Sequence, residues 1–140
     1  MKTTETIKNK NNEILAIIIY NNFKKKGVNF LTSGEFSQQL AFISKKAKEK
    51  ISAHCHEITK RDIVFAQETL FIKKGKVKIN FYSKDKTYFD SRILGKGNVV
   101  LLAGGGHGFE FLKDTEMIEV KQGPYLNEDY KIEFKGIEEI

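Results

Sequence analysis

Short apolar runs separated by turn residues fill most of this sequence, and they limit its fold more than any other feature. Most runs are four to nine residues long and rich in isoleucine, valine, phenylalanine and tyrosine, the composition of β-strands. Glycine-containing turns follow many of them, and no long stretch repeats with the period of a helix. The runs occupy residues 14–20, 36–43, 51–56, 63–72, 76–82, 88–94, 99–103, 109–112, 117–121 and 130–134.

The close spacing of these runs predicts an all-β, antiparallel fold, either a sandwich, a jelly roll or a small barrel. The clearest strand is the one in which Val77, Ile79 and Phe81 alternate with Lys78 and Asn80. Side chains two residues apart lie on the same face of a strand. We therefore expect one face of this strand to be buried and the other to be wet.

A chain of 140 residues is the size of one domain, and its 40% of hydrophobic residues is too high for a disordered protein. Residues 1–12 are polar and rich in lysine, threonine and asparagine, so we expect them to be a flexible tail. Residues 13–140 are expected to form a single β-barrel domain. No apolar run approaches the ~18 residues of a membrane span. A lone cysteine and no export signal indicate the cytoplasm.

The net charge of +6 comes from lysines spread along the chain. Arg61 and Arg92 are the only arginines, whereas proteins that recognise nucleic acids use arginine for base edges and gather their cations on one face. We interpret the lysines as a solvated surface and expect no nucleic-acid partner. A lysine-rich rim suits a small anionic ligand. A nucleic-acid-binding barrel is a weaker alternative, and it would show steep salt dependence.

Two of the three histidines lie two residues apart, in the run 51–56. If that run is a strand, His54 and His56 point to one side of the sheet and Cys55 points to the other. Two imidazoles held in this way can bind one divalent metal ion. An HxH pair is a weak signal alone, but the chain offers two further ligand candidates.

Glu68 and His107 are these further candidates. Glu68 is a carboxylate in an otherwise apolar run, and a buried carboxylate is costly unless it is paired or coordinates a metal. His107 follows three glycines, which let the backbone turn sharply or pass close to a site. Phe109 and Phe111 share the face of His107 in a regular strand, and we expect them to pack in the core.

These motifs resemble those of the cupin superfamily. In that family an HxH pair is followed by a glutamate and a glycine, which here are His54, His56, Glu68 and Gly75. A glycine-rich turn then precedes another histidine, here His107. The resemblance implies a cupin-type double-stranded β-helix, or jelly roll, with antiparallel strands. It also implies a divalent metal ion (iron, zinc, manganese or nickel), whose ligands would be His54, His56, Glu68 and His107.

The resemblance covers about residues 36–121, most of the folded chain, and it departs from the family in the spacing of both motifs, most of all in the first. Eleven residues separate His56 from Glu68, a longer connection than the family motif has. Either this connection is an inserted loop, or Glu68 is displaced, or Glu57 or Asp62 serves as the ligand instead. The sequence leaves open whether the loop opens or closes the pocket.

The resemblance implies a function as well. The stretch 99–125 is similar to small single-domain bacterial cupins of unassigned activity, some of which accompany genes for cell-surface sugars. We therefore expect a metal-dependent enzyme that acts on a small polar molecule, with a sugar or sugar-nucleotide isomerase or epimerase as the leading candidate. A metal-dependent dioxygenase and a non-catalytic small-molecule-binding module are the alternatives. Redox-active iron would favour oxygen chemistry, whereas zinc would favour Lewis-acid chemistry.

A homodimer is also expected, because a jelly roll leaves sheet edges that must be covered. The apolar run 14–20 could cover one edge within the chain or across a dimer. Tyr82, Tyr88 and Tyr125 are candidate proton donors in a pocket, and the sequence does not choose among them.

Overall fold

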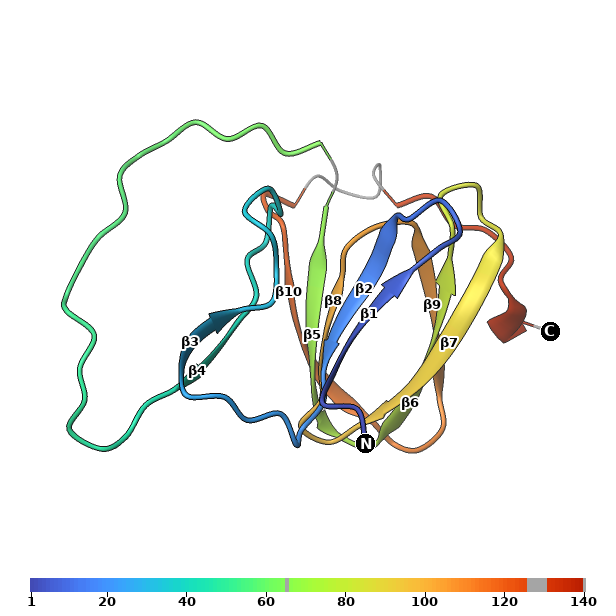
Figure 1. The fold of residues 1–140 in the computed structure, drawn as a ribbon. Coiled ribbons are helices and arrows are strands. Elements are labelled where there is room, and N and C mark those ends of the chain that lie inside the picture. The colour runs from blue at the N-terminus through green and yellow to red at the C-terminus, as the bar shows by residue number, and fades with distance from the viewer. Residues whose placement is uncertain (65, 126–130, 140) are drawn as a thin grey trace.

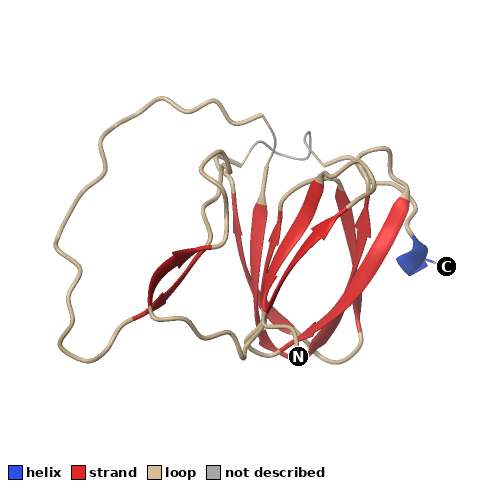
Figure 2. Cartoon of the chain, viewed as in Figure 1, coloured by secondary structure: helices blue, strands red, loops and turns tan. Residues whose placement is uncertain are grey.

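The computed structural model describes residues 1–64, 66–125 and 131–139, and it confirms the all-β, antiparallel fold class. Two sheets share one core, and a separate hairpin stands beside them (Figure 1). Figure 2 shows that almost all of the regular structure is strand, apart from the 3-10 turn η2 (Ile137–Glu139). None of the described residues belongs to a helix that is long and apolar enough to cross a membrane.

The strand order brings distant parts of the chain together. The first sheet has the order β1 (Thr4–Lys8), β2 (Ile14–Ile19), β8 (Val99–Leu102), β5 (Glu68–Lys74) and β10 (Glu116–Lys121). The second sheet has the order β7 (Tyr88–Gly95), β6 (Lys76–Tyr82) and β9 (Gly106–Phe111). The hairpin pairs β3 (Gly27–Phe30) with β4 (Ala41–Ser44). Within the described residues, β9 and β10 are therefore each paired along one edge only.

The main core lies between the two sheets, because alternate residues of their strands are apolar. Val77, Ile79 and Phe81 of β6 are buried there, as their alternation predicts. They belong to one cluster with Ile18 of the first sheet and Leu94 of β7. Burial of side chains of this size stabilises the fold by roughly 1.5–3 kcal/mol each.

The other face of β6 is wet only at its start. Lys78 is partly exposed, but Asn80 and Tyr82 are buried, so the expectation of a solvent-facing side is wrong for the second half of the strand. Residues 131–139, which we call the C-terminal strap, cover this face and bind its polar groups through Glu138. Alternation cannot reveal such a cover because the strap comes from the far end of the chain.

A second, smaller core covers the outer face of the first sheet. Ile17, Leu101 and Ala103 are buried there against the connection between β3 and β4. The residues of that connection are Leu31, Phe36 and Leu40. The predicted strand 36–43 begins only at Ala41 for this reason, since the residues before it form a loop that packs over the sheet.

Three further expectations about local structure need correction. The prediction of a flexible tail at residues 1–12 is wrong, because Thr4–Lys8 pair with β2 and bury Ile7. The predicted strand 51–56 is not a strand, because this segment pairs with neither sheet. The predicted strand 130–134 lies partly outside the described residues, and from Lys131 onward it belongs to the irregular C-terminal strap.

An ionic contact ties the two sheets together along their β1 and β7 edges. Arg92 of β7 places Nη2 2.6 Å from Oε2 of Glu5 and donates from Nε to both oxygens of that carboxylate, at 3.0 and 3.1 Å. Tyr20 donates its hydroxyl to Glu5 Oε1 at 2.9 Å. The hydrogen bonds from Arg92 lower the pKa of Glu5 to about 2, and burial raises the pKa of Tyr20 to about 12.

Candidate functional site

Strand register brings Glu68 and His107 to the same end of the molecule. Glu68 is the first residue of β5 and lies opposite Leu102 and Lys121 in the first sheet. His107 is the second residue of β9 and lies opposite Phe81 of β6. Because Phe81 and its alternating neighbours form the core, His107 is placed on the inner face of the second sheet.

A tight glycine turn sets the start of β9. Gly105 has a positive φ of 62°, and a Cβ at this position would collide with the backbone oxygen of Tyr82. Gly104 is also close to the backbone of Ile14. The turn therefore needs glycine, in agreement with the expectation of a sharp turn before His107.

The two side chains meet across the gap between the sheets. His107 Nε2 lies 3.4 Å from Glu68 Oε2. The side chains keep 27% and 21% of their accessible surface, so the pair is partly shielded from solvent. His107 holds the pKa of Glu68 below its ordinary value, in spite of the partial burial that opposes this shift.

A second carboxylate, which the sequence interpretation missed, lies beside this pair. Glu119 of β10 is opposite Leu70, a core residue, so the register places it on the inner face of the first sheet, where its side chain keeps 46% of its accessible surface. Burial and the neighbouring Glu68 carboxylate raise its pKa above the ordinary value. The sequence carries no signal for it, because the alternation of Glu119 with Ile118 and Val120 would place the glutamate on a solvent-facing side.

Gln67 anchors the chain just before the site. Its side chain is almost completely buried, accepts hydrogen bonds from Ser37 Oγ and the Gln38 N–H at 3.1 and 3.0 Å, and donates to the Ala103 oxygen at 3.2 Å. Its own N–H donates to Gln122 Oε1 at 3.1 Å. Four segments of the chain are joined at this residue, so the beginning of β5, and with it Glu68, is held rigidly.

The two other predicted ligands are elsewhere. His54 and His56 lie in residues 45–64, which we call the arm, and every residue of the arm is exposed. The arm leaves the hairpin, passes outside the two sheets and returns to β5 (Figure 1). The alternative ligands Glu57 and Asp62 lie in the arm as well, and so does Cys55. The structure thus brings Glu68 and His107 together and leaves His54 and His56 apart from them.

The two arm histidines nevertheless remain close to one another. Their ring centroids are 5.3 Å apart, with the ring planes at 78°. His54 Nδ1 lies 2.8 Å from the Ser52 oxygen, a contact within the arm. Over the described ranges 1–64, 66–125 and 131–139, no three histidine, cysteine, aspartate or glutamate side chains gather as a metal site. With the arm in this position, the donor set for a metal ion is incomplete.

The phenylalanines beside His107 only partly follow the expectation of core packing. Phe109 packs against the main core, and its ring centroid lies 5.5 Å from that of His107. Phe111 stacks on Phe109 at 6.3 Å, but 58% of its surface is exposed.

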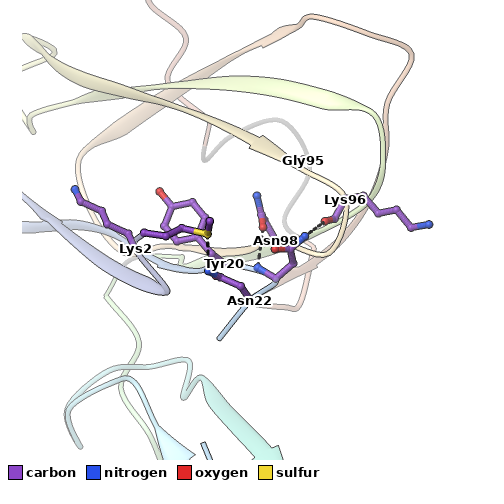
Figure 3. Close-up of a pocket in the computed structure, with 8 residues that line it drawn as sticks. Lys2, Tyr20, Asn22, Gly95, Lys96 and Asn98 are labelled. Atoms are coloured by element: carbon purple, nitrogen blue, oxygen red, sulfur yellow. Dashed lines mark hydrogen bonds between the residues drawn. The ribbon is translucent and has the colours of Figure 1, made fainter. Parts of the chain in front are cut away.

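A surface depression lies at the other end of the sheets. Figure 3 shows it beside Tyr20, Asn22, Lys96 and Asn98, and its volume is about 470 Å³. Asn98 directly precedes β8, whereas Glu68 pairs with the last residue of β8. The depression is therefore separate from the Glu68–His107 pair. Asn21 lines the depression. Its backbone N–H donates to Asn98 Oδ1 at 3.0 Å, and its side-chain amide donates to the Lys96 backbone oxygen at 3.2 Å.

Comparisons with protein-family models, with curated proteins and with solved structures gave no significant match. The function of this chain is therefore inferred from its geometry. The central geometric feature is the contact between Glu68 and His107, two titratable residues that are far apart in the sequence. Glu68 begins β5, directly after the Gln67 anchor, and His107 lies near the beginning of β9, directly after the glycine turn.

Proposed function

We propose that this chain is a cupin-type jelly roll and that its functional site is built on Glu68 and His107. The observation that carries the proposal is the 3.4 Å contact between these side chains, one from each sheet. Both belong to the ligand set that the sequence motifs imply. An inward-facing histidine and carboxylate of this kind suit metal coordination and proton transfer equally well.

The proposed metal site needs the arm to close. In the part of the chain that the structure describes, β9 is paired only with β6, so the backbone groups along its other edge can accept another strand. If residues 51–57 add to this edge, alternation places His54 and His56 on one face, which would be the inner face that already holds His107. Closure of the arm would then complete the set of His54, His56, Glu68 and His107, together with a divalent ion.

The bound metal ion would supply Lewis-acid polarisation of a substrate carbonyl. The remaining chemistry falls to side chains of this chain. Glu68 and Glu119 are neighbours whose pKa values shift in opposite directions, so one favours the deprotonated form and the other retains its proton to higher pH. Such a pair can supply a base and an acid at one site. Proton transfer next to a carbonyl is what a sugar isomerase or epimerase requires.

The proposed substrate is a small polar molecule, and an anionic sugar or sugar nucleotide fits best. Lys121 lies opposite Glu68 in the register and adds a cation at the site. The net charge of +6 would also favour an anion. A metal-dependent dioxygenase is the alternative reaction class, and bound iron in place of zinc would point to it.

A non-catalytic module that binds a small molecule is the second candidate. The observation that favours it is the position of the arm, which leaves Glu68, Glu119 and His107 as hydrogen-bonding groups without the two other histidines. This module would bind the ligand without turnover. The cytoplasmic homodimer is likewise part of the proposal, and sedimentation at micromolar concentration checks the oligomeric state.

The test is a titration of the metal-free protein with Co²⁺ and Zn²⁺, followed by calorimetry and by the Co²⁺ absorption spectrum. The wild type should bind one ion per chain, and His107→Ala and Glu68→Gln should each weaken binding by about tenfold or more. His54→Ala and His56→Ala should weaken it as well if the arm closes.

Glu49→Gln is the matched control, because this exposed carboxylate lies in the arm and belongs to none of the candidate ligand sets. Loss of metal affinity in His107→Ala and Glu68→Gln, but not in His54→Ala and His56→Ala, would support the site and reject closure of the arm. Equal affinity in all variants would reject the metal site.

A further inference from the structure

The C-terminal strap lies behind the strand that carries His107. Its 3-10 turn η2 contacts β9 on the outer face of the second sheet, and Figure 1 shows this turn beside that sheet. His107 faces inward from β9, so its two neighbours, Gly106 and Gly108, face outward. The strap and the candidate site therefore occupy opposite faces of one strand.

The outward-facing glycines make room for the strap. A Cβ at Gly108 would collide with the Glu138 carboxylate, and a Cβ at Gly106 would lie 3.0 Å from the ring of Phe134. Side chains on both sides of His107 would thus push the strap away from β9. The alternation of glycine, histidine and glycine in β9 meets two requirements at once, a functional side chain inside and a docked segment outside.

Buried polar groups hold the strap in place. Asn80 is fully buried and donates to Glu138 Oε2 and Glu110 Oε2 at 3.0 Å each, while its oxygen accepts from Ser91 Oγ at 2.6 Å. Tyr82 donates its hydroxyl to Glu138 Oε2 at 2.5 Å and accepts from the Ile137 N–H at 2.8 Å. Without the strap, the Asn80 amide would keep Glu110 and lose Glu138, one of its two carboxylate partners.

The strap matters for β9 because this strand has little other support. Among the described residues, its backbone is paired only with β6, along one edge, and an edge strand opens more easily than a central one. The ring of Phe134 packs at 5.0 Å against Tyr82 of β6, next to Gly106 of β9, so the strap spans both strands.

We propose that the C-terminal strap is a positioning element for His107 and that Glu138 fixes the strap to the second sheet. Docking of the strap on the outer face keeps β9 paired with β6 and holds the His107 imidazole at its distance from Glu68. Binding at the inner face and docking at the outer face then favour one another. The inference depends on the proposed function only in taking His107 as the site.

The test uses variants whose substitutions lie within the strap and should detach it from the second sheet. Gly136→Ala would place a Cβ against the Glu138 carboxylate and the Tyr82 hydroxyl, and Glu138→Ala removes that carboxylate. Gly34→Ala is the matched control, since a Cβ there meets nothing within 4 Å. Hydrogen exchange followed by mass spectrometry would report on residues 131–139 and 106–111 separately, and calorimetry would give the Co²⁺ dissociation constant.

Both strap variants should exchange faster in the strap and in β9, and their Co²⁺ dissociation constant should rise by about tenfold. The control should match the wild type in all three measurements. A variant whose strap exchanges rapidly while β9 and the Co²⁺ affinity stay unchanged would overturn the inference.

The two proposals can fail separately. If the wild type binds no Co²⁺, the metal-site proposal fails, and exchange in residues 106–111 alone decides whether the strap supports β9. Gly108→Ala would disturb the Glu138 carboxylate from β9, whereas Gly136→Ala disturbs it from within the strap. Equal changes in exchange and Co²⁺ affinity in the two variants would show that release of the strap, and not a local change in either segment, is the cause.

Discussion

The two sheets and the arm are built from similar residues, yet they behave as opposites. Ile79 in β6 is completely buried, whereas Ile58 in the arm is completely exposed. Arg92 binds two carboxylates, whereas Arg61 makes one 3.4 Å contact to the backbone of Thr59. The difference shows that an apolar or basic residue stabilises this fold only where the chain supplies a partner for it.

The largest expected effect separates the core from the arm. Phe81→Ala should lower the free energy of unfolding by about 3–5 kcal/mol, because it empties a packed position between the sheets. Ile58→Ala in the arm should change it by less than about 0.5 kcal/mol. Urea unfolding followed by circular dichroism measures both. A large loss from Ile58→Ala would show that the arm packs on the body in solution.

The ionic contact between β1 and β7 gives the next effect. Arg92→Ala should cost about 2 kcal/mol, less than a fully buried pair because the guanidinium is partly exposed. Arg61→Ala, its counterpart in the arm, should be neutral. The same unfolding measurements would detect the difference, and equal losses would mean that charge alone, without a partner, is responsible.

The Arg92 contact also predicts a pH dependence with a definite sign. Since the folded pKa of Glu5 is about 2, below its ordinary value of 4.5, its contribution is complete above pH 4.5 and is lost as the pH falls from there toward 2. Arg92→Ala should flatten this part of the stability curve, so wild type and variant should converge in acid. Parallel curves down to pH 2 would contradict the assignment.

The smallest effect is expected where the arm joins the sheets. Gln67→Ala removes the side-chain hydrogen bonds of a buried amide and should cost about 1–2 kcal/mol. The same change at Gln39, which is exposed and bonded to the hairpin connection, should cost less. Limited trypsin digestion would show whether cleavage after Lys60 or Arg61 becomes faster when this anchor is lost. Unchanged stability and cleavage would mean that the arm is held elsewhere.

Much of the framework followed from local pattern. The runs at β2, β6, β7, β8 and β10 were predictable because their apolar residues are β-branched or aromatic and are bounded by turns. β1 was not, since its residues are mostly polar and its stability comes from pairing with β2 and from the contact of Glu5 with Arg92. The segment 51–56 has the alternation of a strand but pairs with no other strand of the described residues.

The candidate site was predictable in the same uneven way. Glu68 and His107 attract attention because each is a polar residue in an unusual setting, one in an apolar run and one after three glycines. Glu119 did not, because a glutamate in an edge strand is usually solvent-facing, and only the register with Leu70 shows that it faces inward. Asn80 was expected on a wet face for a similar reason, before the strap covered it.

The amino-acid sequence by itself determined which segments can be strands, where the chain must turn at glycine, and which side chains can bind a metal or move a proton. These properties depend on neighbouring residues and on the chemistry of each side chain. The tertiary structure decided which of those side chains meet. It joined Glu68 to His107, left His54 and His56 in the arm, and placed the strap behind β9, because pairing and burial between distant segments are set by the fold as a whole.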